Sequence, residues 1–501
     1  MINKRYALFT LVVAIMGWCP ATIAQAATDS DAIMQRLLAL EENQRRLEAE
    51  LAQRDMRIAE LEQHVGLTDE HLRSMDVTPA MESEAMAATT QAAPPAADKD
   101  DSVLGIFNTG GAGITLAQSE NAKLNFSAWS YVRYLNQRGL DDSYTDSFGR
   151  EFDIDLRNDF QVSKVNLTFS GWLFDPAFRW MFYTWTSNTS QGESAQVVVA
   201  GNMKYKFNEH LDVGLGIDAL PGTRSMSGTF PRFNKVDSRP MADEFFRPSY
   251  TTGIWSAGKI TDRSQYKLML GNNLSQLGVN ASRLDDQLNT WSGRIDWMPT
   301  TGEFGPQRGY DDWEMHDEVA TLFGIAATRS KEDRQSQPGT EDINNSQIRL
   351  SDGTRIFQPG AFNTNGRINR ATYEMLAMDV GMKYQGFALS GEYYWRWVDD
   401  FEIEGDIPVD DLYDHGFQLQ TSYMFIPKYL QGYVAGSKIY GEYGDPWDTA
   451  IGVNWYPKRE RLFRVNSELV YMKDSAVGYS SIPYAVGGDG VAFHTNVEMK
   501  F

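Results

Sequence analysis

Basic residues recur at alternate positions along segments whose other positions are apolar, and they carry the chemistry that the sequence suggests. In a narrow, partly dehydrated space, arginine offers an anion several fixed donors and cannot lose its charge, so it should bind phosphate-like groups better than lysine does. If the apolar positions of each segment face one way, the opposite parity groups the basic side chains on the other face. The basic residues of this second face are Arg133, Lys164, Lys204, Lys267, Arg294, Lys383, Arg396 and Arg464.

Acidic residues occupy the same face, so the surface that these segments share is predicted to have mixed charge. Its acidic members are Asp212, Asp218, Asp296, Asp379, Glu392 and Glu468. Two interpretations stay open. The charges pair and stiffen the wall, or a local excess of basic groups creates a field that orders water and favours anions.

Other kinds of chemistry have weaker support in the sequence. The six histidines are scattered, and none has a second metal ligand at helical or hairpin spacing, so no metal site is predicted. The glycine cluster at 110–113 lacks the strand, lysine and helix of a phosphate-binding loop, and we interpret it as a flexible approach to the first strand. The aspartate pairs at 399–400 and 410–411 could hold calcium or could simply be solvated.

No nucleophile, base and orienting acid combine at local spacing anywhere in the chain. We therefore expect no enzyme activity and no cofactor. A hydrolase stays open as an alternative that only geometry could support.

The C-terminal residues 490–501 show the kind of element that must position these side chains. From Phe493 to Phe501, apolar residues alternate with mostly polar ones, which is the pattern of a strand with two different faces. Such a strand would be an aggregation-prone edge in an open sheet, whereas in a closed barrel it has a partner on each side. The terminal Phe501 also resembles the C-terminal signature by which bacterial outer-membrane barrels are recognised for insertion.

Period-two segments recur from Lys123 onward, joined by short turns and long polar loops. We predict an all-β transmembrane barrel of about 16 antiparallel strands over residues 123–501, an even number as bacterial barrels require. The predicted strands are 124–136, 164–171, 178–185, 196–207, 211–217, 253–260, 265–273, 290–298, 319–329, 372–384, 387–398, 416–426, 430–443, 449–456, 462–473 and 490–501.

Short turns and long loops sort to opposite sides of such barrels, with the short turns in the periplasm. An even strand count then places both ends of the barrel, and anything N-terminal to it, in the periplasm. The predicted extracellular loops are 137–159, 220–252, 274–289, 331–371, 400–412 and 474–489. The connection 299–318 is long but falls on the periplasmic side, so it is either an extended turn or a slip of the predicted register.

Loop 220–252 is the predicted constriction because its local charge is positive, with five basic residues against three acidic ones. The charged residues of this loop are Arg224, Arg232, Lys235, Arg239 and Arg247 against Asp237, Asp243 and Glu244. Charges more than about 8 Å from the pore axis are screened at physiological salt, so the loop should outweigh the net charge of the chain. The predicted pore-lining and solute-binding residues are Arg133, Lys164, Lys267, Arg294, Lys383, Arg396, Arg224, Arg232 and Arg239.

The composition and the N-terminus limit the class of protein. No run of about 18 apolar residues occurs, which argues against a helical membrane protein. The net charge of -21 argues against a general nucleic-acid role. Residues 1–26 combine a charged start, a short apolar stretch and an A-x-A cleavage site, which predicts an export signal. The only cysteine, Cys19, lies within this signal, so the mature chain has no thiol chemistry.

Residues 28–66 carry a heptad seam from Ile33 to Val65, which predicts a periplasmic coiled coil. Leucine and isoleucine are mixed along the seam, so a dimer and a trimer both stay open. Residues 67–122 lack the large apolar residues that offset ordering entropy, and we predict a flexible linker leading to the barrel.

Several motifs within the predicted barrel suggest a family. They are Leu173-Phe174-Asp175, Thr252 to Gly258 (TGIWSAG), Lys383 to Phe387 (KYQGF) leading to Gly391-Glu392-Tyr393-Tyr394, Gln418 to Pro427 (QLQTSYMFIP), and Gly452-Val453-Asn454-Trp455-Tyr456, the most specific of them. With these motifs, residues 124–501 resemble the phosphate-selective porin O and P family. The resemblance implies a trimeric, sixteen-stranded outer-membrane channel, and it does not identify the solute.

We therefore expect a passive, water-filled outer-membrane channel for small solutes that prefers anions, with phosphate as the family's suggestion. The expected partners are outer-membrane lipid, small solutes and two further copies of the chain in a homotrimer, and we expect no nucleic acid. One alternative is a structural tether, in which the coiled coil contacts the cell wall and the lumen is plugged. The other alternative is an outer-membrane hydrolase.

Overall fold

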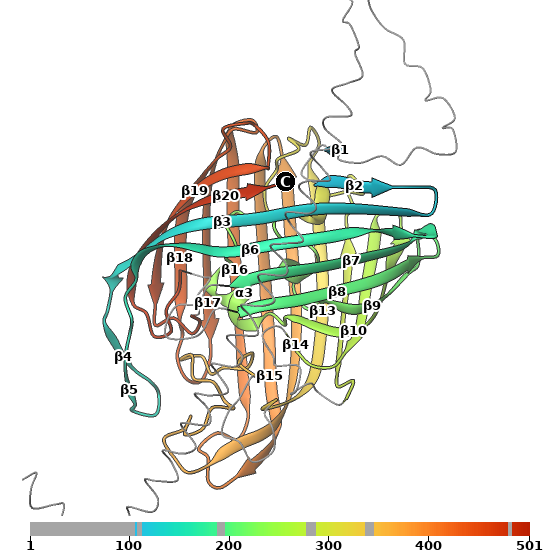
Figure 1. The fold of residues 1–501 in the computed structure, drawn as a ribbon. Helices are drawn as coiled ribbons and strands as arrows, with labels where there is room; N and C mark the ends of the chain where they lie inside the picture. Colours follow the sequence, from blue (N-terminus) through green and yellow to red (C-terminus); the bar gives the residue numbers. More distant parts are fainter. Residues whose placement is uncertain (1–105, 108–112, 188–195, 277–286, 336–344, 479–482) are drawn as a thin grey trace, which may run out of the picture. The chain divides into compact units, whose positions relative to one another are not determined.

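The computed structural model describes residues 106–107, 113–187, 196–276, 287–335, 345–478 and 483–501. Sixteen antiparallel strands of this part form one closed barrel, in which each strand pairs with the next along the chain and β20 pairs with β3 (Figure 1). The barrel strands are β3 (Ala122–Leu140), β6 (Asn158–Leu173), β7 (Asp175–Ser187), β8 (Gln196–Lys206), β9 (Asp212–Ala219), β10 (Tyr250–Thr261), β11 (Ser264–Gly271), β12 (Thr290–Trp297), β13 (Ala320–Asp333), β14 (Arg367–Tyr384), β15 (Phe387–Glu404), β16 (Leu412–Ile426), β17 (Leu430–Tyr440), β18 (Trp447–Trp455), β19 (Phe463–Lys473) and β20 (Gly490–Lys500).

Each of the sixteen predicted strands is present, and the predicted parity of their faces is confirmed. On β16, Leu419 is 52% exposed on the outside of the barrel, whereas its neighbours Gln418 and Gln420 are 3% and 5% exposed on the inside. Such a sheet turns its apolar side chains outward and its polar side chains toward the lumen.

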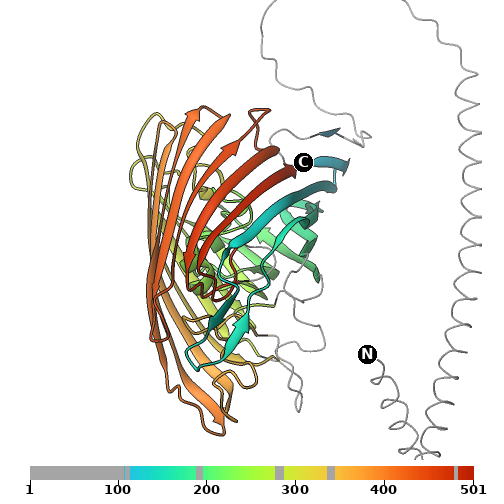
Figure 2. The ribbon, with the colours of Figure 1, turned by 90° about the vertical axis from the view of Figure 1, so that its left-hand side faces the viewer.

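The barrel closes where β20 meets β3, and Figure 2 shows the red C-terminal strands beside the blue β3. Just beyond β20, Phe501 and Ala128 exchange both backbone hydrogen bonds, each at 3.0 Å. Residues 123–126 of β3 extend past this point and pair with β2 (Ile114–Gln118), which pairs in turn with β1 (Ile106–Phe107). The expected flexible approach to the barrel therefore includes two short strands, and they cover the part of β3 that β20 does not reach.

The connections sort to two ends, as predicted. At the end that holds the C-terminus, β14 and β15 are joined through Gln385 and Gly386, whose φ values of 46° and 84° suit the tight turns that match strand twist. The predicted register does not slip at 299–318, because β12 and β13 pair continuously and the long connection 298–319 joins them at the short-turn end.

The long loops pack on one another at the opposite end. The loop after β3 contains a hairpin of β4 (Ser143–Thr145) and β5 (Glu151–Asp153). At its tip the ring of Phe148 lies 5.4 Å from that of Phe362 and 5.6 Å from that of Tyr443. Loops from three different hairpins are thereby held together over the mouth of the barrel.

The predicted export signal (1–26), the coiled coil (28–66) and most of the linker (67–122) lie outside the described residues. In the described part of the chain, no helix is both long enough and apolar enough to cross a membrane.

Leu419 lies at the centre of β16 and Tyr413 near its long-loop end, so the pair tests which surface contacts lipid. Leu419→Arg should lower the free energy of unfolding by about 2–4 kcal/mol, because a cation at the bilayer midplane loses its water, whereas Tyr413→Arg should cost about 0–1 kcal/mol. Denaturant unfolding of the protein folded into lipid vesicles measures both. Equal costs at the two positions would contradict a lipid-facing exterior.

Candidate functional site

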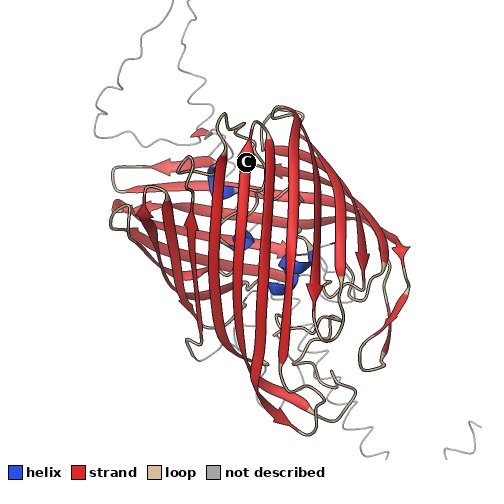
Figure 3. Ribbon diagram, turned by 180° about the vertical axis from the view of Figure 1, so that it is seen from behind, coloured by secondary structure: helices blue, strands red, loops and turns tan. Residues whose placement is uncertain are grey.

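The loop between β9 and β10, residues 220–249, folds back into the interior of the barrel. It contains the 3-10 helix η1 (Arg224–Met226) and the short helix α3 (Met241–Phe246), whose residues are all buried. Figure 3 shows these helices in blue within the barrel. The helix α3 packs against β16, β17 and β18, far around the barrel from β9, so the loop crosses the lumen.

Aromatic side chains of α3 also contact β14 and β15, the strands next to this wall. The ring of Phe246 stacks on that of Tyr394 with centroids 5.1 Å apart. The guanidinium of Arg396 lies 4.1 Å from the centroid of the Phe245 ring. Tyr373 donates its hydroxyl hydrogen bond to the carbonyl oxygen of Phe246 at 2.7 Å, which pairs a carbonyl at the helix end.

Buried polar contacts tie the middle of the loop to other strands. Lys235 Nζ lies 3.0 Å from Glu468 on β19, and the two side chains are 1% and 0% exposed. Lys164 on β6 lies 2.5 Å from Asp237. Arg133 on β3 donates to the carbonyl oxygen of Val236 at 2.6 Å. Removing one partner of a buried pair leaves a charge without water or counterion, so these contacts fix the path of the loop.

The long connection 298–319 enters from the short-turn end and meets this loop. Arg308 Nη2 donates to the carbonyl oxygen of Ser227 at 2.8 Å, and Arg224 Nη2 donates to that of Arg308 at 3.2 Å. The guanidinium of Arg224 also lies 4.5 Å from the centroid of the Tyr310 ring. The lumen is therefore occupied by segments from both ends of the barrel.

Several predicted wall residues lie sealed beneath these two segments. Arg396 is fully buried and lies 2.7 Å from Asp414. Arg294 is 3% exposed and lies 2.6 Å from Asp379. Lys383 is 1% exposed.

Lys383 and Arg133 both donate hydrogen bonds to uncharged acceptors. Lys383 Nζ donates to the carbonyl oxygen of Phe304 at 2.8 Å and lies 4.5 Å from the centroid of that ring. Arg133 Nε donates to Asn496 Oδ1 at 2.7 Å. Both cations bind the inner segments or the neighbouring strand, and neither faces open lumen in this arrangement.

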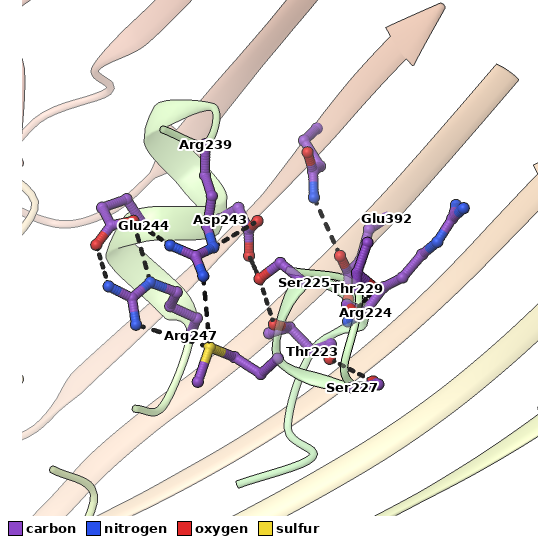
Figure 4. Close-up of polar contacts among 12 residues, drawn as sticks. Thr223, Arg224, Ser225, Ser227, Thr229, Arg239, Asp243, Glu244, Arg247 and Glu392 are labelled. Atoms are coloured by element: carbon purple, nitrogen blue, oxygen red, sulfur yellow. Dashed lines mark hydrogen bonds and ion pairs between the residues drawn. The ribbon is translucent and has the colours of Figure 1, made fainter. Parts of the chain in front are cut away.

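Two of the predicted loop arginines, Arg224 and Arg239, lie on different sides of the loop (Figure 4). Arg224 is 2% exposed, donates from Nη1 to Ser390 Oγ at 2.7 Å and donates from its backbone N–H to Glu392 at 2.9 Å. Arg239 lies 3.4 Å from Glu244 at the other side of the loop. These two arginines hold the loop in shape.

Arg232 lies apart from this pair, on the side of the loop that faces the connection 298–319. Its Nε donates to Gln307 Oε1 at 2.9 Å, and its carbonyl oxygen accepts from Tyr310 N–H at 3.2 Å. Arg232 therefore joins the two inner segments to each other.

Charged inward side chains on strands β8, β9 and β11 keep contact with solvent. The side chains of Lys204, Asp218 and Lys267 are 39%, 28% and 21% exposed, whereas those of Arg396 on β15 and Glu468 on β19 are 0% exposed. The inner segments thus pack on one wall and leave room along the other.

Sequence reasoning missed two basic residues of the interior. Arg308 in the connection 298–319 lies 2.6 Å from Asp296, and Arg461 in the turn after β18 lies 2.6 Å from Asp311. The signal that could have found Arg308 was the unusual length of 299–318 at the end where the other turns are short, because such a segment has room to fold inward.

The described residues contain no group of three or more histidine, cysteine or acidic side chains placed to hold a metal ion. The buried acids of the lumen face arginines and lysines instead, as the pairs of Arg294 and Arg396 show.

No family model matches this sequence, and no curated protein matches it by sequence. Solved structures resemble the fold at low identity. An anion-selective porin from Comamonas acidovorans has a TM-score of 0.48 and 10% identity, over 76% of this chain and 100% of that one. The outer-membrane channel DcaP of Acinetobacter baumannii has a TM-score of 0.45 and 9% identity, over 78% and 100%. OmpF of Salmonella typhi, in complex with daunomycin, has a TM-score of 0.41 and 12% identity, over 76% and 98%. At these scores the similarity assigns no family, and the resemblance to the phosphate-selective porins O and P stays a prediction.

Asp243 on α3 is the acid of the loop whose ion-pair partner lies farthest away. It is 1% exposed and accepts a hydrogen bond from Ser225 Oγ at 2.9 Å, and Arg239 Nε is 3.9 Å away. Burial raises the pKa of Asp243 to about 6, while Arg239 acts in the opposite direction. Ionisation of Asp243 therefore lowers the free energy of unfolding of the protein.

Asp243→Asn should stabilise the protein at pH 7.5 by up to about 3 kcal/mol, because the amide resembles the protonated acid and the pKa shift of about two units has that value. Between about pH 4 and 6 the folded protein binds more protons than the unfolded chain, so wild-type stability should rise on acidification and approach that of the variant. Unfolding curves across this pH range measure both effects.

Asp237→Asn is the matched control for this loop. Asp237 has Lys164 at 2.5 Å and the hydroxyl of Tyr131 at 2.8 Å, so its neutralisation should destabilise the protein at pH 7.5. Destabilisation by Asp243→Asn at pH 7.5 would contradict the assignment of Asp243 as the uncompensated acid.

Proposed function

We propose that this chain is an outer-membrane porin, a passive channel for small solutes. One observation carries the proposal: a closed sixteen-stranded barrel with an apolar exterior and a charged interior. Closure pairs the backbone groups within the sheet, which is what hydrocarbon demands of a strand that crosses it. The charged interior with solvent-exposed lysines along β6 to β11 supports a hydrated path rather than a dry core.

Outward aromatic side chains support the same placement. Trp397 and Tyr413 are 39% and 41% exposed near the long-loop end, and Tyr423 and Trp455 are 45% and 42% exposed near the short-turn end. Aromatic side chains concentrate where a barrel meets the two membrane–water boundaries. With the short turns in the periplasm, the N-terminal residues would lie there too. The homotrimer remains part of the proposal through the family resemblance.

For the solute, we propose a weak anion preference. It is set along the wall formed by β6 to β11, where Lys204 and Lys267 keep contact with solvent. We call this the solvated wall. Lys164 and Lys204 lie there with side chains 13% and 39% exposed. Arg239 and Arg247 of the loop add guanidinium groups that are 10% and 11% exposed. In this proposal Arg224, Arg133 and the other buried cations hold the inner loop in position. They affect the solute only by fixing where the loop lies.

Replacing Lys204, the more exposed of the two lysines, with glutamine should reduce the anion preference of the channel. A charge about 8 Å from the ion contributes about 0.5 kcal/mol in water, which favours an anion and disfavours a cation, so its loss should lower the anion-to-cation permeability ratio about fivefold. The reversal potential in a KCl gradient across a planar bilayer measures the ratio. Lys438→Gln, on the outer face of β17, is the control and should change nothing. A cation-selective native channel would overturn the anion assignment and leave the porin proposal standing.

A structural tether is the second candidate function. A barrel that serves only as an anchor is expected to have a plugged lumen. Two inner segments do fill one side of the lumen here, and they bury Arg396 and Glu468 completely. The solvated lysines of the other wall favour the channel.

Deleting residues 28–102 should leave the single-channel conductance of the barrel unchanged, since the sixteen barrel strands lie within residues 122–500. Planar-bilayer recordings of the full mature chain and of the deletion variant make the comparison. A tether would show no conductance in either protein and would lose attachment to isolated cell wall when the segment is removed.

A further inference from the structure

A row of buried amide side chains crosses the wall on which loop 220–249 packs. The row runs from β20 through β19, β18 and β17 to β16, and Asn234 of the loop lies within it. Each of its amides is at most 5% exposed. In order, the amides are Asn496, Asn466, Asn454, Gln431, Asn234, Gln420 and Gln418. We call this set the amide row.

Each amide of the row donates its N–H to the oxygen of the next one. From Asn496 to Gln431, the three nitrogen–oxygen distances between consecutive side chains are 2.9, 2.9 and 2.8 Å. Near the other end, Gln420 Nε2 donates to Gln418 Oε1 at 2.7 Å. Because every donor points the same way, the amide row has a direction.

The two ends of the row fix this direction. At the first end Arg133 Nε donates to Asn496 Oδ1 at 2.7 Å, and a guanidinium donates but never accepts. At the other end Gln418 Nε2 donates to Glu392 Oε2 at 3.1 Å, and Glu392 also accepts the backbone N–H of Arg224 at 2.9 Å (Figure 4). A reversed row would place a donor against a donor at the first end and an acceptor against an acceptor at the other.

Asn234 is the link that the loop supplies to the row. Its Oδ1 accepts from Gln431 Nε2 at 3.2 Å, and its Nδ2 lies 3.4 Å from Gln420 Oε1, the longest contact of the row. Its backbone carbonyl oxygen accepts from Asn454 Nδ2 at 2.9 Å. The wall therefore holds both the side chain and the main chain of residue 234, and the row is complete only while the loop lies against it.

The row also meets the loop at both of its ends. Arg133 Nη2 donates to the carbonyl oxygen of Val236, and Glu392 accepts from Arg224 N–H. Hydrogen bonds in a chain polarise and strengthen one another, and a buried amide that loses its partner is costly. The loss of one link at residue 234 should therefore loosen the loop at its other contacts with the row.

We propose that Asn234 is the positioning residue that seats loop 220–249 in the lumen, as one link of a one-way hydrogen-bond chain from Arg133 to Glu392. The consequence for solutes rests on the porin function. Arg239 and Arg247 of the loop are 10% and 11% exposed, and they depend on this seat for their place in the channel. A neutral residue that is itself 1% exposed thus sets where the exposed charges lie.

A cysteine at residue 242 reports whether the loop is seated. The only native cysteine, Cys19, lies in the predicted export signal, so the mature chain offers no other thiol. Ala242 on α3 is 0% exposed, and cysteine behaves as a small apolar residue. In Ala242→Cys a water-soluble thiol reagent should react only when the loop leaves the wall. Mass spectrometry of the full mature chain, folded in detergent, gives the rate of modification.

Asn234→Asp, made in the Ala242→Cys protein, should raise the modification rate at least about tenfold. The carboxylate keeps the accepting atom and loses the donor that faces Gln420, which leaves buried groups unpaired. Asn273→Asp is the matched control, because Asn273 is also 1% exposed and its Oδ1 accepts the hydroxyl hydrogen of Thr251 at 2.9 Å, a role that a carboxylate keeps. The control should leave the rate unchanged, and an unchanged rate in Asn234→Asp would overturn the assignment of Asn234.

The direction of the row allows a sharper test with Glu392→Gln. Alone, this variant should also raise the modification rate, because its new donor meets the donor of Gln418. Combined with Asn234→Asp it should restore protection, although Gln420 and Gln418 separate the two positions in the row. Gln420 turns its amide to donate to the new carboxylate, Gln418 turns with it, and the glutamine at residue 392 donates to the oxygen of Gln418.

Glu392→Met is the control for this combination, because it removes the same charge without supplying a donor. It should restore nothing. Restoration by both Glu392→Gln and Glu392→Met would assign the effect to charge repulsion, and restoration by neither would mean that the row carries no direction. Either result would overturn the one-way chain.

Planar-bilayer recordings separate this inference from the porin function. In a conducting protein, Asn234→Asp should make the open current fluctuate more, because a loop that leaves the wall moves Arg239 and Arg247 within the lumen. A conducting channel in which neither the modification rate nor the current responds to Asn234→Asp would overturn the inference alone. A raised modification rate in a protein that conducts no current would support the seat of the loop and overturn the channel.

Discussion

The sheet closes because β20 pairs with β3, and the rest of the molecule depends on that closure. An unpaired strand edge would leave a row of backbone donors and acceptors exposed, which neither lipid nor a folded interior tolerates. Phe501 exchanges both backbone hydrogen bonds with Ala128, so the pairing runs to the last residue of the chain. Where β3 extends further, β2 takes over as its partner. Closure is what forces alternate residues of every strand to face either the outside or a shared interior.

The interior then has to accommodate its own charges. On the wall from β13 to β20, the inward charges are withdrawn from water and satisfied by partners, as Arg396 is by Asp414 and Glu468 by Lys235. A buried pair of this kind contributes little net stability compared with apolar packing, but breaking it is costly. These pairs therefore specify where loop 220–249 lies. The sequence left open whether the inward charges pair with one another or create a field that favours anions. On this side of the barrel they pair.

On the other side of the barrel, charged side chains stay in contact with solvent. The inner loop leaves the side chains of Lys204 and Lys267 in contact with water, and Arg308 of the connection 298–319 reaches the inner loop from the short-turn end. The two inner segments are tied to each other by Arg224 and Arg232. A solute on the proposed path would pass between a charged wall and the inner segments that these contacts hold in place.

The sequence alone determined the barrel, because period-two alternation over sixteen segments is a local property that each strand carries by itself. It also determined which side chains face inward, since parity follows from the same alternation.

The sequence placed loop 220–252 in the interior because of its charge. It could not say that Arg224 would be buried beside Ser390 while Lys204 stayed in water. That distinction depends on which wall the loop packs against, and the choice is made by contacts between residues far apart in the chain, such as Lys235 with Glu468 and Phe246 with Tyr394. The inward fold of 298–319 was likewise undetermined, because a long connection can extend into solvent or into the lumen. Only the tertiary structure decided it, by offering Arg308 the carboxylate of Asp296 and the carbonyl of Ser227 inside the barrel.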